Sequence, residues 1–144
     1  MNFITLTQKD LDYILSVYQG NFADGWNKNM LISAFEDGRF HAIALENQGV
    51  PVGVVTFSVA LDTADIEGVV VVLSERKKGF GAKLIKKAEQ EMLSLGVEKA
   101  FLEVRESNVP AKNLYQSLGY GKISVRKNYY SDGENAIVMA KDLK

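Results

Sequence analysis

The chain has 144 residues, of which 47% are hydrophobic and 24% charged, with a net charge of −1, one histidine and no cysteine. We therefore expect a single globular domain over residues 1–144. The sequence shows no secretory signal and no apolar run that approaches the about 20 residues of a membrane-spanning helix, so we expect the protein in the cytoplasm. The absence of cysteine excludes disulfides and a cysteine nucleophile, and a single histidine excludes a metal site built from several His and Cys ligands.

The charges are unevenly distributed along the chain. Residues 1–72 carry 3 Lys or Arg and 9 Asp or Glu, whereas residues 73–144 carry 14 and 9. The overall balance argues against a nucleic-acid partner. A basic second half suits a small polyanionic ligand, and an acidic first half suits a cationic substrate; chance clustering on solvated faces remains the alternative.

The first 38 residues predict one short strand and two helices. Phe3–Thr5 has strand character, and Thr7 with Asp10 forms a capping box that opens a helix with one apolar face. That face carries Leu11, Ile14, Leu15 and Tyr18. Residues 20–27 read as a loop, Asn27 as the cap of a second helix through Phe35, and Gly38 as its end.

Three strands are expected next. Residues 40–45 and 52–60 should pair around a turn at 47–49, and a second turn is expected at 62–65. Residues 66–73 form a nearly continuous β-branched run, which predicts a strand buried on both faces. His41 lies in the first of these strands, where a lone histidine is usually structural and not part of a Ser-His-Asp triad.

The second half predicts a loop–helix unit followed by strand, helix and hairpin. Residues 74–81 are polar and basic, and residues 82–95 form a helix that ends at Gly96. Its apolar stripe comprises Leu84, Ile85, Ala88, Met92 and Leu95. A strand at 99–105, a helix from Asn108 to Gly119 carrying Leu114, Tyr115 and Leu118, and a hairpin of 123–130 with 136–140 around 131–133 complete the chain. The expected fold class is mixed α/β (α+β), a mostly antiparallel central sheet flanked by helices.

The segment from Val69 to Ala82 carries the strongest local signal. A strand runs through a loop with Gly79 and Gly81 directly into a helix, whose free N–H groups form an anion site that glycines allow a phosphate to approach. Basic residues cluster at the start of this helix, against the preference of its dipole by about 0.3–1 kcal/mol per charge. A helix with this charge order is suited to hold an anion at its start, and a solvated basic face is the alternative. The spacing fits neither a Walker A loop nor a Rossmann fingerprint.

The loop Arg76-Lys77-Lys78-Gly79-Phe80-Gly81 resembles the [Arg/Gln]-x-x-Gly-x-[Gly/Ala] motif of GNAT acetyltransferases. The resemblance implies a GNAT fold with acetyl-CoA as cosubstrate, its pyrophosphate bound by the amides of this loop and of Ala82. It further implies that Val69, Val70 and Val71 lie beside the pantetheine and the acetyl group, with a backbone N–H that stabilises the oxyanion.

Two C-terminal segments resemble the N-terminal protein acetyltransferases of that family. They are residues 102–120, with Leu102-Glu103, Ser107-Asn108 and Leu118-Gly119-Tyr120, and the tail 126–139 with its paired tyrosines. Within that branch the chain is most similar to bacterial enzymes that acetylate ribosomal protein S18. The resemblance therefore implies a protein N-terminus as substrate, specifically the N-terminal alanine of S18.

Glu103 is the expected general base. At pH 7 an α-amine, with a pKa of about 8, is mostly protonated, so a group must take up its proton before it attacks. Strand alternation places Glu103 on one face with Phe101 and Arg105. A structural glutamate paired with Arg105 is the alternative.

Tyr115 is the expected acid that protonates the CoA sulfur, a role that the family resemblance implies. From the helix pattern alone it would be a core tyrosine. The resemblance also implies that the Asn108 side chain binds the pantetheine, in addition to its cap position, and that Trp26, Tyr129 and Tyr130 contact the peptide substrate.

Two positions depart from the family pattern, and two alternatives follow. Gly25-Trp26 stands where Pro-Trp is usual, and Gly68 where the family often has Asn. These changes keep open an acetyltransferase for lysine side chains or a small amine. A non-catalytic acyl-CoA-binding module is the other alternative. Without cysteine, direct transfer in a ternary complex is expected.

Overall fold

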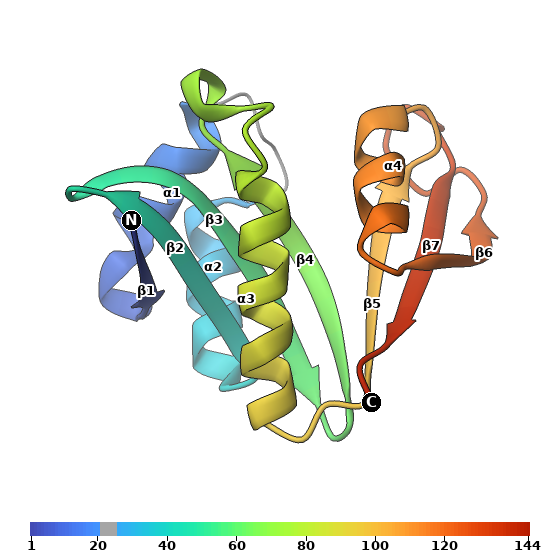
Figure 1. Cartoon of the computed structure of the whole chain (residues 1–144), viewed down its shortest axis with the longest axis horizontal. Helices are drawn as coiled ribbons and strands as arrows, with labels where there is room; N and C mark the ends of the chain where they lie inside the picture. Colours follow the sequence, from blue (N-terminus) through green and yellow to red (C-terminus); the bar gives the residue numbers. More distant parts are fainter. Residues whose placement is uncertain (21–25) are drawn as a thin grey trace.

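The computed structural model describes residues 1–20 and 26–144, which form a seven-stranded sheet in the order β1-β2-β3-β4-β5-β7-β6 (Figure 1). Every neighbouring pair is antiparallel except β4–β5, which is parallel. The strands are β1 (Asn2–Leu6), β2 (Phe40–Asn47), β3 (Val50–Ala60), β4 (Thr63–Val71), β5 (Lys99–Arg105), β6 (Gly121–Arg126) and β7 (Ala136–Asp142). The expected mixed, mostly antiparallel sheet is confirmed.

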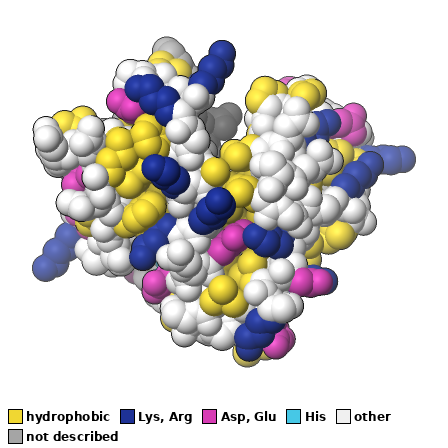
Figure 2. Space-filling view, in the orientation of Figure 1, with side chains coloured by type: hydrophobic (Ala, Val, Ile, Leu, Met, Phe, Trp, Pro, Cys, Tyr) yellow, Lys and Arg dark blue, Asp and Glu magenta, His cyan; other side chains and the backbone are white. Residues whose placement is uncertain are grey.

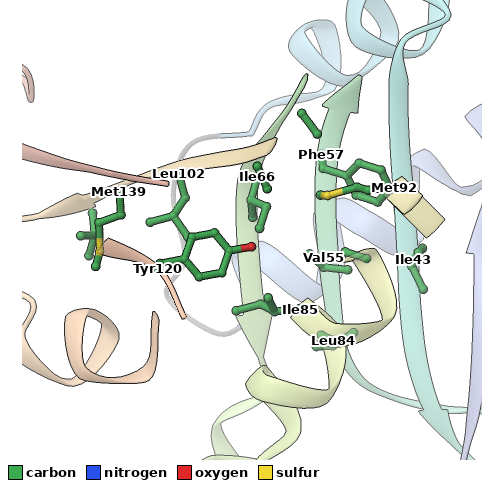
Figure 3. Close-up of a cluster of buried hydrophobic side chains, with 14 of the residues drawn as sticks. Ile43, Val55, Phe57, Ile66, Leu84, Ile85, Met92, Leu102, Tyr120 and Met139 are labelled. Carbon is green, nitrogen blue, oxygen red and sulfur yellow. The ribbon is translucent and has the colours of Figure 1, made fainter. Parts of the chain in front are cut away.

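Helices cover both faces of the sheet. They are α1 (Leu11–Gln19), α2 (Lys28–Asp37), α3 (Phe80–Ser94) and α4 (Val109–Ser117), with 3-10 turns at Gln8–Asp10 and Leu73–Glu75. On one face α1 and α2 pack on β2 and β3 through Ile14, Leu31 and Val54. On the other, α3 buries Leu84, Ile85 and Met92 against Val55 and Phe57 (Figure 3). Within the described residues, no helix is long and apolar enough to cross a membrane.

The sheet opens between β4 and β5. These strands pair only from Thr63 with Lys99 to Ile66 with Leu102. Beyond that point β4 continues to Val71 and β5 to Arg105, and Figure 1 shows the two strands diverging. The carboxyl ends of two adjacent strands are therefore separated, and the edge of β4 is left unpaired by β5.

A buried carboxylate joins the two halves of the split sheet. Glu89 on α3 is 8% exposed, accepts a hydrogen bond of 2.7 Å from the Tyr120 hydroxyl and pairs at 2.9 Å with Nζ of Lys141 on β7. Burial, and then the bond to Glu89, raise the pKa of Tyr120. Figure 3 shows the Tyr120 ring reaching from beside Leu102 toward Ile85 on α3. Since α3 packs on β2–β4, this contact fixes the second half of the sheet against the first.

The local capping signals of the sequence are confirmed. Thr7 and Asp10 form the capping box, and the side chain of Asn27 accepts from Met30 N–H at 2.9 Å at the start of α2. Gly38 ends α2 in the left-handed conformation. His41 stacks on Phe57, and burial lowers its pKa, as befits a structural histidine.

Four expectations about elements were wrong. The turn expected at 62–65 falls at Leu61–Asp62, with Leu61 left-handed, so that β4 already begins at Thr63. The β4 strand is not buried on both faces: Asp65 and Glu67 are exposed, and Val69 and Val71 are only partly buried, where the sheet opens. Leu95 is 43% exposed because the helix has ended there.

The fourth concerns the final hairpin. Its first strand, β6, ends at Arg126 instead of extending to Tyr130. Asn128 is left-handed and donates its N–H to Asn135 Oδ1 at 2.9 Å, and Tyr130 N–H donates to Glu134 O at 3.1 Å. The segment 127–135 therefore closes on itself as a loop, and Tyr129 and Tyr130 belong to that loop.

Replacement of Lys141 should show how strongly the buried Glu89 contact holds the fold. Lys141→Met leaves a buried carboxylate without its cation, so the free energy of unfolding should fall by about 2 kcal/mol. The matched control is Lys99→Met, whose ion pair with Asp142 is exposed and 3.6 Å long; we expect a change below about 0.5 kcal/mol. Urea denaturation measures both, and equal small effects would contradict the structural role of Glu89.

Candidate active site

The unpaired edge of β4 presents backbone N–H groups to the opening. Val72 N–H donates to Val52 O of β3 at 2.9 Å. Because hydrogen-bonding direction alternates along an antiparallel strand, the backbone groups of Val69 and Val71 face the other way, toward β5. The Val71 carbonyl there accepts a 3.0 Å bond from Arg76 Nε. Backbone N–H groups of β4 therefore face the space between the separated strands.

Gly79 and the first turn of α3, through Ala82, form a cradle of uncapped backbone N–H groups beside this edge. Gly79 is the left-handed N-cap (φ 84°), and no side chain caps the helix. The first four N–H groups of a helix have no partner within it, so those at Phe80, Gly81 and Ala82 are available to a ligand. The Phe80 side chain is 8% exposed in the core, so only its backbone can take part.

Basic side chains surround that cradle. Figure 2 shows Lys and Arg gathered over α3 and the preceding loop. Lys78 pairs with Glu75 at 3.1 Å, and Lys77 adopts a left-handed conformation (φ 65°) that helps turn the chain. The predicted residues 76–82 thus lie together, next to the predicted Val69–Val71.

Tyr115 approaches the opening from the other half of the sheet. A Cβ placed on Gly81 would lie 3.4 Å from Leu114 Cδ2, so α4 packs directly on the cradle. Tyr115 is half-buried, and its ring meets Tyr120 edge to face at 6.3 Å between centroids. Burial raises the pKa of Tyr115, so it keeps its proton well into the alkaline range. Asn108 caps α4 through its side-chain oxygen, and contact with a cofactor would fall to its amide NH₂ group.

A groove of about 1170 Å³ lies on the α2 face of the sheet beside the opening. Its lining includes Trp26 at the edge of α2 and the acidic residues Asp65 and Glu67 of β4. Burial raises the pKa values of Asp65 and Glu67. Glu103, Tyr129 and Tyr130 line the other side, so the predicted base and all three predicted substrate contacts share one groove.

Glu103 is held by residues of the last hairpin. It pairs with Arg126 Nε at 3.2 Å, and its hydrogen bond to the Tyr129 hydroxyl raises the pKa of that tyrosine. The alternative pairing with Arg105 does not form. Arg105 instead binds Asp132 and Glu134 at 2.9 and 3.0 Å and lies 4.0 Å over the Tyr130 ring. That leaves Glu103, with a side chain 27% exposed, directed into the groove.

Several residues of the site are not recognisable from the sequence. Asp65 and Glu67 belong to no motif, and Arg126 is only the first residue of the tail 126–139, with no role assigned to it. The register of the sheet brings Asp65 and Arg126 beside Glu103. Gly25, one of the two departures from the family pattern, lies outside the described residues. Among those described, no group of three or more His, Cys, Asp or Glu could hold a metal ion.

Comparison with known proteins places this arrangement in context. Residues 11–120 match the model of the Acetyltransferase (GNAT) family. The chain is 33% identical, over 97% of each chain, to the ribosomal protein bS18-alanine N-acetyltransferase of Escherichia coli (strain K12). It is 28% identical to the enzyme of the same name from Haemophilus ducreyi, over 94% of this chain and 96% of the relative. The crystal structure of the Escherichia coli ribosomal-protein-S18-alanine N-acetyltransferase superposes with a TM-score of 0.90 at 30% identity, covering 99% of this chain and 94% of that one.

Proposed function

The chain belongs to the GNAT acetyltransferase family, and we propose that it transfers the acetyl group of acetyl-CoA to the N-terminal alanine of ribosomal protein S18, in the cytoplasm. The observation that supports this proposal most directly is the similarity, over nearly the whole chain, to enzymes named for that substrate. We further propose that residues 1–144 act as one catalytic domain.

The described residues fit acetyl-CoA. The uncapped N-terminus of α3, with Arg76, Lys77 and Lys78 before it, suits the pyrophosphate, and Asn108 lies at the start of α4 on the other side of the opening. When bound there, acetyl-CoA supplies an activated acetyl group as a thioester. The N–H groups of Val69 and Val71, on the unpaired edge of β4, suit the oxygen of that thioester as negative charge develops on it.

The groove supplies the acceptor side. Glu103 takes the proton of the α-amine, directly or through water, and Arg126 and Tyr129 fix the carboxylate in place. Trp26, Tyr129 and Tyr130 offer aromatic walls for the first residues of a protein N-terminus. The acidic side chains of this groove suit a cationic substrate before it loses its proton.

Tyr115 completes the transfer. A thiolate leaves and needs a proton, and the raised pKa of Tyr115 keeps that proton in place until it is required. With no cysteine to carry the acetyl group, the amine attacks the thioester directly.

One other acceptor class remains in view. Gly25 and Gly68 differ from the family pattern on the acceptor side, so a lysine side chain or a small amine is the second candidate. A non-catalytic acyl-CoA-binding module is disfavoured. Such a module needs only the cofactor loop, whereas this chain also carries Glu103 and Tyr115 on the second half of the split sheet.

Removal of either functional group should reduce turnover without loss of fold. Glu103→Gln and Tyr115→Phe should each lower kcat by about 10²–10⁴-fold, since each deletes one proton transfer. The matched controls are Glu106→Gln, in the exposed turn that follows β5, and Tyr13→Phe, on α1. Initial rates with both substrates varied should give intersecting lines. Parallel lines, or variants as active as their controls, would contradict this mechanism.

Mass spectrometry on two peptides tests the acceptor. One peptide carries the S18 N-terminal sequence with a free α-amine, and the other is the same peptide, blocked at its N-terminus, with an internal lysine. We expect acetyl transfer only to the free α-amine. Transfer to the lysine would replace the proposal by the second candidate, and transfer to neither despite bound acetyl-CoA would support the binding module.

A further inference from the structure

Two buried hydroxyl groups face each other over Gly68. Tyr18 on α1 is 2% exposed and Thr56 on β3 is 0% exposed. Within the described residues, neither hydroxyl has a hydrogen-bond partner of acceptable geometry. Buried polar groups are almost always paired, so an unpaired couple at one place indicates a ligand or water that satisfies both.

Glycine at position 68 makes room for this couple. A Cβ there would overlap the Tyr18 hydroxyl and lie 3.3 Å from Thr56 Oγ1. The backbone of Gly68 does not adopt the left-handed conformation, so space is what requires glycine at this position. The Tyr18 hydroxyl therefore occupies the volume that a side chain on residue 68 would fill.

The couple borders the reaction centre. Gly68 directly precedes Val69, whose N–H faces the opening of the sheet, and it stands opposite Thr56 in the register of β3 and β4. Glu67, the residue before Gly68, lines the groove that also holds Glu103.

Tyr18 remains neutral under working conditions. Burial raises its pKa to about 12, and the smaller effects of Thr56 and Trp26 oppose that rise. A neutral hydroxyl accepts a hydrogen bond without taking up the proton. It can therefore orient a reactant but does not compete with Glu103 as the base.

We propose that Tyr18 and Thr56 are positioning residues that bind the nitrogen of a primary amine acceptor. A neutral primary amine attacks through its lone pair and carries two N–H groups. One proton passes to Glu103, and the other N–H donates to the Tyr18 hydroxyl, which in turn donates to Thr56. This contact aims the lone pair at the acetyl carbon. The inference rests on the proposed function and adds two positioning residues to its acceptor site.

The test compares Tyr18→Phe and Thr56→Val with Tyr13→Phe. Tyr13 lies on the same helix, but its hydroxyl already binds Glu46 Oε2 at 2.7 Å. Two probes are used, the S18 N-terminal peptide and the same peptide with N-methylalanine first, whose neutral amine has a single N–H. We expect Tyr18→Phe to lower kcat/KM for the first peptide at least about tenfold, with the KM of acetyl-CoA unchanged. The wild-type preference for the first peptide should shrink in this variant.

Folding is monitored by the midpoint of thermal unfolding, which should not fall in Tyr18→Phe because no internal hydrogen bond is lost. If the wild type acetylates the peptide and Tyr18→Phe and Thr56→Val match Tyr13→Phe in both kcat/KM and preference, the inference is overturned. If the wild type instead acetylates the blocked lysine peptide, the S18 proposal fails, and the same three variants are compared on lysine and N-methyllysine. Activity on no primary amine would overturn the inference as well.

Discussion

The separation of β4 from β5 after Ile66 and Leu102 is the constraint on which the rest of the structure depends. Pairing beyond that point would consume the N–H groups of Val69 and Val71 in the sheet. Because the strands diverge, those groups face an opening, and the N-terminus of α3 and the start of α4 flank it. The buried Glu89, held by Tyr120 and Lys141, keeps the two halves together behind the opening.

The two halves carry complementary chemistry. The β4–α3 half offers backbone donors and basic side chains, which suit an anionic cosubstrate and a developing oxyanion. The β5–α4–β7 half offers a carboxylate on Glu103 and a protonated phenol on Tyr115, which suit the two proton transfers of acyl exchange between a thioester and an amine. Since each half supplies only part of the site, the relative placement of the halves matters as much as any single side chain.

Much of this could be predicted from the sequence where the signal is local. The Thr7–Asp10 box, the Asn27 cap and the loop around Gly79 depend on residues within a few positions of one another. The first two form as expected, and the third differs only in that its helix begins at Phe80, two residues earlier than expected. Contacts set by register or by distant segments could not be predicted. The register of β5, β7 and β6 brings the Arg126 side chain to Glu103 across β7. The packing of α1 on the sheet brings the Tyr18 hydroxyl to Gly68. The incomplete burial of Val69 and Val71 was missed, because a β-branched run indicates strand propensity and does not show where the neighbouring strand ends.

A crystal structure of the protein with acetyl-CoA tests the central claim most directly. The pantetheine should enter between β4 and β5 beyond Ile66 and Leu102, with the pyrophosphate on the amides of Gly79–Ala82. The thioester oxygen should lie within hydrogen-bond distance of the N–H of Val69 or Val71. Acetyl-CoA bound elsewhere, or β4 and β5 paired along their full length in the complex, would contradict the role assigned to the opening of the sheet.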